Sequence, residues 1–264
     1  MCNTYQSSSG IYIVMTMALI FKDLTHNNKL KNNYKKYSLS IIAYILGMMF
    51  YMFETKFCKE FSEHGEIVKI ANMKDMPNII IRNANSYFKT IFKQSSKIWI
   101  VLFFLIILVF VVSYIFQSKN NYIKNTISVI LYLALGSVLS YGAYLVLSLD
   151  LADNGSPRNY YGFGMFVAIT LIMLSNSKIH FSVFNLSKNI LLFSFVYYIF
   201  SFNLTCASML NYQKEEFQRQ SVIFTNEIKN MVNEQRKTIY ANKLFKDSPV
   251  FDNTARNYPT LYIS

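Results

Sequence analysis

Residues 98–116 read IWIVLFFLIILVFVVSYIF, an uncharged apolar run that lies between Lys97 and Lys119. A helix needs roughly 20 apolar residues to cross the hydrocarbon core of a bilayer, so this run is long enough to span a membrane. Across the 264 residues, 53% are hydrophobic and only 15% are charged. This composition argues against a soluble enzyme and predicts an all-α, polytopic membrane protein.

Five further stretches have the length and hydropathy of a membrane helix. The range 127–149 is free of charge, and 190–211 lies in an uncharged interval between Lys188 and Lys214. The first stretch has no Lys or Arg before its apolar part, which a secretory signal would need, so we expect it to be a membrane helix. About six transmembrane helices are therefore predicted, near 1–21, 37–53, 98–116, 127–149, 160–176 and 190–211.

The connection between the first two predicted spans is strongly basic, with a single acid, Asp23, against Lys22, Lys29, Lys31, Lys35 and Lys36. Short loops rich in Lys and Arg stay on the cytoplasmic side. Alternating six spans from there places the loop 150–159 and the chain after Asn211 outside. We thus expect a transmembrane helical bundle over 1–212 and an extracytoplasmic polar helical tail over 213–264.

The outer segment 54–97 contains an amphipathic run. Five of its residues share one helical face, namely Ile80, Ala84, Tyr87, Phe88 and Ile91, and three basic residues lie on other faces, namely Arg82, Lys89 and Lys93. Such helices commonly lie in the membrane interface with basic side chains near lipid phosphates. We expect an interfacial helix here, as a surface anchor rather than a substrate-binding element.

Several function classes find no support. The net charge of +12 is scattered between apolar runs rather than gathered on one basic patch, which disfavours nucleic-acid binding. Neither the three cysteines nor the three histidines have metal-ligand spacing, and no P-loop, G-x-G-x-x-G or G-x-S-x-G motif is present. The predicted spans carry no charge in their inner parts, which disfavours an ion-coupled transporter. We expect no metal and no cofactor.

The outer loop DLADNGSPRNYYGFG, residues 150–164, is the best candidate for a site. Arg158 lies at the membrane boundary, where a guanidinium can bind a phosphate headgroup with two parallel hydrogen bonds. Tyr160 and Tyr161 can stack on a sugar, or simply lie at the interface as tyrosines often do. Asp150 and Asp153 are the nearest acids, and Asp150 is a candidate general base or only the end of a helix.

In their order along the chain, four segments resemble the O-antigen glucosyltransferases of the Gtr type II family. They are CNTYQSSSGIY at 2–12, NIIIRNANSYFK at 78–89, SPRNYYGFG at 156–164 and ASMLNYQKEE at 207–216. The resemblance runs over nearly the whole chain. Its more characteristic parts are the Tyr5-Gln6 pair with the serines that follow, and the Pro157-Arg158 turn.

The resemblance implies a polytopic enzyme of the bacterial inner membrane, similar to the GT-C class of glycosyltransferases. Such enzymes take glucose from a polyprenyl phosphate carrier on the periplasmic side and add it to O-antigen, a lipopolysaccharide modification that converts the serotype. It further implies that Arg158 binds the carrier phosphate and that the periplasmic tail helps to hold the acceptor polysaccharide. By the same reasoning, Tyr160 and Tyr161 become substrate-binding candidates.

One departure from the family pattern concerns the catalytic acid. The resemblance places that acid in a large outer loop near the N-terminus, and no equivalent loop precedes Lys22. We therefore expect the C-terminal portion of such an enzyme, with a missing N-terminal fragment as a partner, and the activity of this portion alone is left open. The alternatives are another envelope polysaccharide protein, such as an O-antigen polymerase-like protein, or a non-enzymatic membrane transport component.

Overall fold

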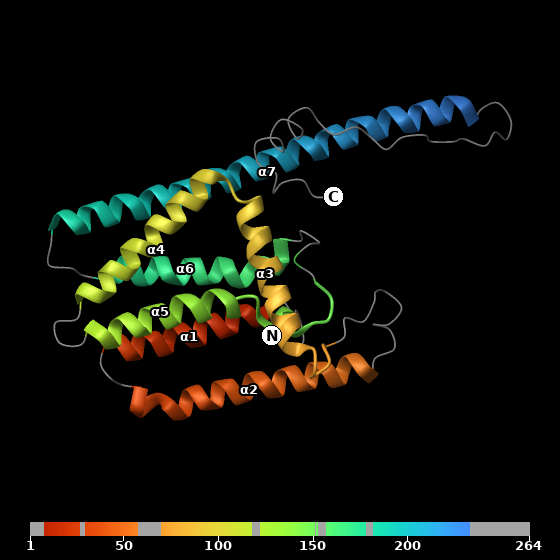
Figure 1. Cartoon of the computed structure of the whole chain (residues 1–264). Helices are drawn as coiled ribbons and strands as arrows, with labels where there is room; N and C mark the ends of the chain where they lie inside the picture. The colour runs from red at the N-terminus through yellow and green to blue at the C-terminus, as the bar shows by residue number, and fades with distance from the viewer. Residues whose placement is uncertain are drawn as a thin grey trace. The chain divides into compact units, whose positions relative to one another are not determined.

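The computed structural model describes residues 8–26, 30–57, 70–117, 122–150, 152, 157–177 and 182–232. Within these ranges the regular elements are all helical (Figure 1). They are α1 (Ser9–His26), α2 (Leu30–Phe57), α3 (Met76–Gln94), α4 (Lys97–Gln117), α5 (Tyr122–Leu139), η3 (Gly142–Val146), η4 (Pro157–Tyr160), α6 (Tyr161–Asn176) and α7 (Ser182–Val232). An isolated antiparallel bridge joins Ile70 to Leu147. The predicted all-α class is confirmed.

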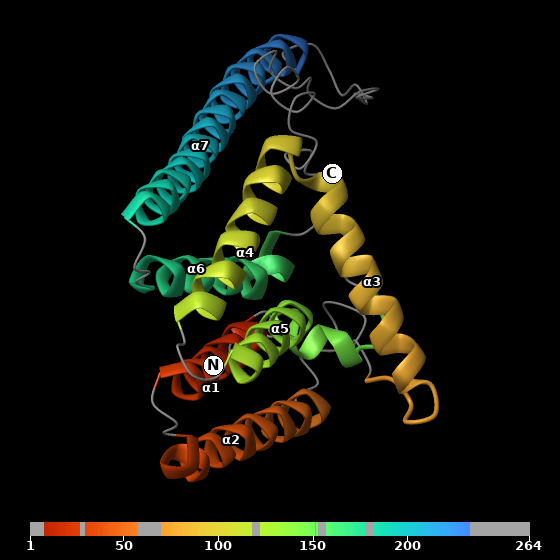
Figure 2. The same ribbon diagram turned by 60° about the vertical axis from the view of Figure 1, so that its left-hand side comes forward.

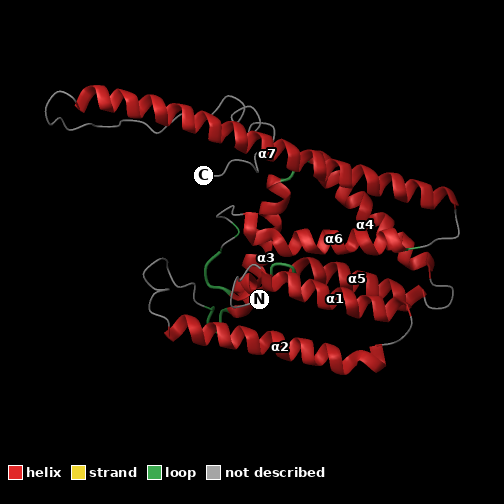
Figure 3. Ribbon diagram, turned by 180° about the vertical axis from the view of Figure 1, so that it is seen from behind, coloured by secondary structure: helices red, strands yellow, loops and turns green. Residues whose placement is uncertain are grey.

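The chain divides into two compact units. The first comprises Met1–Lys93 and Ile100–Leu192, and the second comprises Gln94–Trp99 and Phe193–Ser264. In the first unit, α1 packs chiefly against α5 and α6, and also contacts α2 and η3. Figures 1 and 3 show α1 between α2 on one side and α5 on the other.

Aromatic side chains from four helices form the centre of the first unit. Phe21 of α1 lies 4.7 Å from Tyr132 of α5, measured between ring centroids. Phe110 of α4 and Phe166 of α6 lie 5.9 and 5.6 Å from the same Tyr132 ring. All four side chains are buried. Packed aromatic pairs bury large apolar areas, so this cluster holds α1, α4, α5 and α6 together.

Helix α3 has the two faces that its sequence predicts. Tyr87 and Ile91 are buried, whereas Arg82, Lys89 and Lys93 are exposed. The helix lies across the direction of α1, α5 and α6 rather than along it (Figures 1 and 2). The predicted helix is therefore present, and its location in the membrane interface stays a prediction.

Three helices among the described residues are long and apolar enough to cross a membrane. They are Lys97–Phe116, Tyr122–Leu139 and Val183–Lys229, and the shorter apolar helix Tyr161–Asn176 joins them. These helices coincide with or overlap the predicted spans at 98–116, 127–149, 190–211 and 160–176. The membrane character is thus supported, while the total of six spans and the GT-C-like architecture stay predictions.

The helix expected over 127–149 ends early, at Leu139. The chain turns at Ser140 and Tyr141, and Gly142 then takes a φ of 63°, which belongs to the left-handed region. A right-handed helix cannot continue through that conformation, and glycine reaches it at little cost. The range 140–149 therefore forms a turn and the short helix η3 instead of the last part of a membrane helix.

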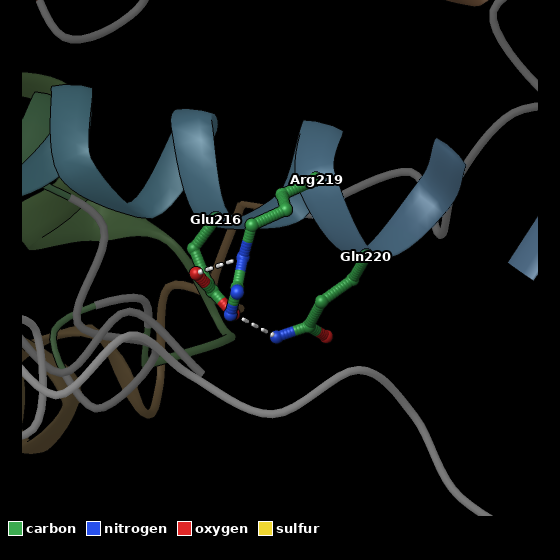
Figure 4. A network of polar contacts seen from close by, with 3 residues as sticks. All are labelled: Glu216, Arg219 and Gln220. Carbon is green, nitrogen blue, oxygen red and sulfur yellow. Dashed lines mark hydrogen bonds and ion pairs between the residues drawn. The ribbon is translucent and has the colours of Figure 1, made fainter. Parts of the chain in front are cut away.

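Most of α7 belongs to the second unit, and the helix continues without a break through the apolar and polar parts of its sequence. On the polar part, Arg219 and Gln220 donate hydrogen bonds to the Glu216 carboxylate (Figure 4). Such pairs one turn apart stabilise an exposed helix modestly. The boundary predicted between 212 and 213 and the outside location of the tail stay predictions, and 233–264 lie outside the described residues.

Candidate functional site

The turn after α5 is the point where three segments of the first unit meet. A Cβ atom added to Gly10 of α1 would lie 1.9 Å from the carbonyl oxygen of Ser140, and one added to Gly162 of α6 would lie equally close. Both helices therefore approach the Ser140 backbone more closely than any residue with a side chain allows. The glycines fix the first turns of α1 and α6 against this turn.

A stack of three tyrosines extends from the same turn. Tyr87 of α3 lies between Tyr141, at 4.2 Å, and Tyr160 of η4, at 5.5 Å between ring centroids. Its hydroxyl and the Ser140 Oγ are 3.0 Å apart, and its side chain is fully buried. Burial is the main cause that raises the pKa of Tyr87. The stack ties α3 to both ends of the loop between α5 and α6.

Asn83, one turn before Tyr87, holds the backbone of η3. Its Nδ2 atom lies 2.8, 3.1 and 3.2 Å from the carbonyl oxygens of Leu147, Tyr144 and Leu145. Arg82 donates from Nη2 to the Ser148 carbonyl oxygen at 2.7 Å, and to the Asn83 Oδ1 as well. The carbonyl groups at the end of the short helix η3 have no partners within that helix and therefore require hydrogen-bond donors from elsewhere. The side chains of Asn83 and Arg82 on α3 supply these donors.

Replacing Asn83 with alanine is expected to lower the free energy of unfolding by about 1–3 kcal/mol, because buried carbonyls would lose their donor. The measurement is the unfolding transition of the detergent-purified protein. Asn85 lies on the exposed side of α3, so Asn85→Ala serves as the matched control. Equal transitions for the two variants would contradict the role given to Asn83.

Of the residues predicted from the sequence, Asp150 and Tyr160 are brought together through Ala152. The Ala152 amide donates to Asp150 Oδ1 at 3.0 Å, and the Tyr160 hydroxyl donates to the Ala152 carbonyl oxygen at 2.8 Å. Tyr160 is partly buried by the stack, whereas Tyr161 is 54% exposed. Of these two tyrosines, Tyr161 therefore presents far more of its ring to a ligand.

The other predicted residues are less completely placed. The backbone of Arg158 lies in η4, directly before α6, and its side chain lies outside what is described. Asp153 lies outside the described residues. In the part of the chain that is described, no three His, Cys, Asp or Glu side chains gather in a way that could hold a metal ion.

Tyr141 and the Arg82-Asn83 pair are components of this region that the sequence reasoning did not assign to it. Tyr141 falls within the range read as a membrane helix, where a tyrosine suggests only a packing contact. The structure buries it, and burial, followed by the nearby Asp150 carboxylate, raises its pKa. The signal in the sequence that could have predicted this turn is Gly142, because a glycine commonly follows the end of a helix.

Comparison with known protein families places this region within a family match. The family model described as glucosyl transferase GtrII matches residues 1–169, which is more than half of the chain. The matched region includes α1 to α5, the tyrosine stack and the loop that carries Asp150, Arg158 and Tyr160. No curated protein and no solved structure matches the chain.

Proposed function

The chain belongs to the glucosyl transferase GtrII family, and from this membership we propose that it transfers glucose from a polyprenyl phosphate carrier to O-antigen or a related surface polysaccharide. Membership implies a glucosyltransferase that acts in O-antigen modification. The carrier, the acceptor and the bacterial inner membrane as the location are our proposal. The match over 1–169 is the observation that carries it, because it includes the candidate site.

The position of the site suits a lipid-linked donor. The loop 150–160 connects the turn that follows α5 to the first turn of α6, and both helices are apolar. The ends of membrane helices lie at the level of the lipid headgroups, where the phosphate of a polyprenyl carrier also lies. A residue of this loop can therefore reach that phosphate without entering the hydrocarbon core.

Arg158 is the residue that we propose for the carrier phosphate. In the transfer, the acceptor hydroxyl oxygen forms a bond to the anomeric carbon of glucose. The bond from that carbon to the phosphate oxygen breaks, and its electron pair stays on the phosphate. A guanidinium that binds two phosphate oxygens stabilises this developing charge. The acceptor proton passes to a carboxylate, for which Asp150 and Asp153 are the candidates.

The two neighbouring tyrosines receive different parts in this proposal. The hydroxyl of Tyr160 donates a hydrogen bond to the Ala152 carbonyl oxygen, and its ring stacks on Tyr87. We therefore give Tyr160 the role of holding the loop in position beside the substrate. Tyr161, whose side chain is exposed, offers a ring on which a sugar can stack. Both remain substrate-binding candidates, one through position and one through direct contact.

Expression of the full chain in a bacterium that makes polyprenyl phosphate glucose and unmodified O-antigen tests the proposal. We expect a glucose side branch on the O-antigen repeat, detected by mass spectrometry and linkage analysis, that cells with the empty vector lack. A change in polysaccharide chain length without added glucose would favour the polymerase-like alternative. Solute uptake without any glycan change would favour a transport component.

A further inference from the structure

Tyr141 is the exception among the three stacked tyrosines. The hydroxyl of Tyr87 pairs with Ser140 and that of Tyr160 with Ala152. The hydroxyl of Tyr141 is buried and has no hydrogen-bond partner within the described part of the chain, and its side chain is only 1% exposed. Buried polar atoms nearly always have partners, so each exception calls for an explanation.

The ring of Tyr141 is held firmly, which gives its hydroxyl a defined position. Tyr87 stacks on it at 4.2 Å, and Tyr144 lies 5.4 Å away. Asp150 interacts electrostatically with this tyrosine. In the described structure the Asp150 carboxylate accepts one hydrogen bond, through Oδ1, so that Oδ2 is left to accept another. Asp150 is also linked through Ala152 to Tyr160, whose ring stacks on Tyr87 as that of Tyr141 does. A donor and an acceptor thus belong to one connected region, each able to make a further hydrogen bond.

We infer that Tyr141 and Asp150 together bind one hydroxyl group of a sugar substrate. The Tyr141 O–H donates to the sugar oxygen, and the sugar hydroxyl donates its own hydrogen to Asp150 Oδ2. A hydroxyl is both donor and acceptor, so a single group satisfies both residues. A phosphate oxygen fits less well, because it would place a second negative charge beside the Asp150 carboxylate.

The approach to this position runs past the turn at Asp150. Ser148 and Leu149 are exposed and Asp150 is partly exposed, whereas Tyr87 and Tyr144 cover the ring from the protein side. In this inference a sugar approaches from the side of Asp150, where the chain is exposed. The inference rests on the proposed function, for which it supplies a sugar-binding residue.

Tyr141→Phe in the full chain is the test. Loss of one substrate hydrogen bond is expected to lower kcat/KM for glucosyl transfer about tenfold, mainly through KM. The unfolding temperature should be unchanged or higher, since phenylalanine removes a hydroxyl that has no partner in the free protein. Tyr87→Phe is the matched control for stability, because its hydroxyl has a partner and its removal should lower the unfolding temperature.

Substrates that each lack one hydroxyl identify the bound group. One series consists of polyprenyl phosphate sugars, and the other consists of acceptor glycans. In one series we expect a member whose disadvantage relative to the complete substrate is smaller for Tyr141→Phe than for the wild type, because the variant has only the bond to Asp150 left to lose. The series in which this member occurs shows whether the donor or the acceptor contacts Tyr141.

Two results would overturn the inference alone, provided that the wild type transfers glucose. One is a Tyr141→Phe variant with wild-type kcat/KM for every substrate. The other is a Tyr141→Phe variant as destabilised as Tyr87→Phe, because its hydroxyl would then have a partner within the protein. A wild-type protein that transfers no glucose would instead overturn the proposed function, and this inference with it.

Discussion

Replacement of Gly162 by alanine is expected to destabilise the protein by about 3 kcal/mol or more, the upper range for overpacking in a rigid core. The added Cβ would lie 1.9 Å from the Ser140 carbonyl oxygen and 3.2 Å from the Gly10 Cα. Both neighbours are backbone atoms, so no side chain can rotate to make room. Helix α6 would have to move away from α1 and from the turn that carries Tyr141.

The same helix offers a matched control for this substitution. A Cβ added to Gly164 would meet nothing within 4 Å. Gly164→Ala should therefore leave the fold unchanged or stabilise it slightly, because alanine favours a helix more than glycine does. The measurement is the yield and unfolding temperature of each variant after purification in detergent. Equal values for Gly162→Ala and Gly164→Ala would show that α1 and α6 do not meet at Ser140 as described.

Arg158→Ala should lower the rate of glucosyl transfer about 100-fold, which corresponds to about 3 kcal/mol of lost stabilisation of the leaving phosphate. Arg158→Lys keeps the positive charge but loses the planar, bidentate geometry, so an intermediate rate is expected. The measurement is the initial rate of glucose incorporation in isolated membranes, normalised to the amount of protein present.

Lys22→Ala is the control for the loss of a basic residue elsewhere. Lys22 is exposed on α1, in the connection predicted to lie on the cytoplasmic side and not in the loop 150–160. Its removal should leave the transfer rate within about twofold of the wild type, because substitutions of exposed residues outside a site have small effects. An Arg158→Ala variant that behaves like Lys22→Ala would remove Arg158 from the proposed site.

The fold class could be predicted from the sequence because it depends on local properties. The run at 98–116 is uncharged and of membrane-spanning length, and the structure places a helix at Lys97–Gln117. The periodicity of Tyr87 and Ile91 likewise predicts the buried face of α3. The length of an apolar run, its lack of charge and its helical spacing can all be read from a single sequence. They predict that a helix forms and which of its faces is buried, without knowledge of its packing partners.

The arrangement of the candidate site depends on contacts between distant segments, which hydropathy does not reveal. Asn83 bonds to carbonyls some 60 positions further along the chain, and Gly10 meets Ser140. Apolar residues continue past Leu139, so composition alone extends the helix where Gly142 ends it. Asp150 and Tyr160 were found because they share a loop, whereas Tyr141 was missed because it lay inside a predicted span.

Transfer of labelled glucose from synthetic polyprenyl phosphate glucose to O-antigen, by membranes that contain the full chain, tests the central claim most directly. The account predicts label in the polysaccharide with this donor, and none with membranes that lack the protein. Absence of transfer, or transfer that uses only a nucleotide-linked glucose, would contradict the claim that the chain is a glucosyltransferase served by a lipid carrier.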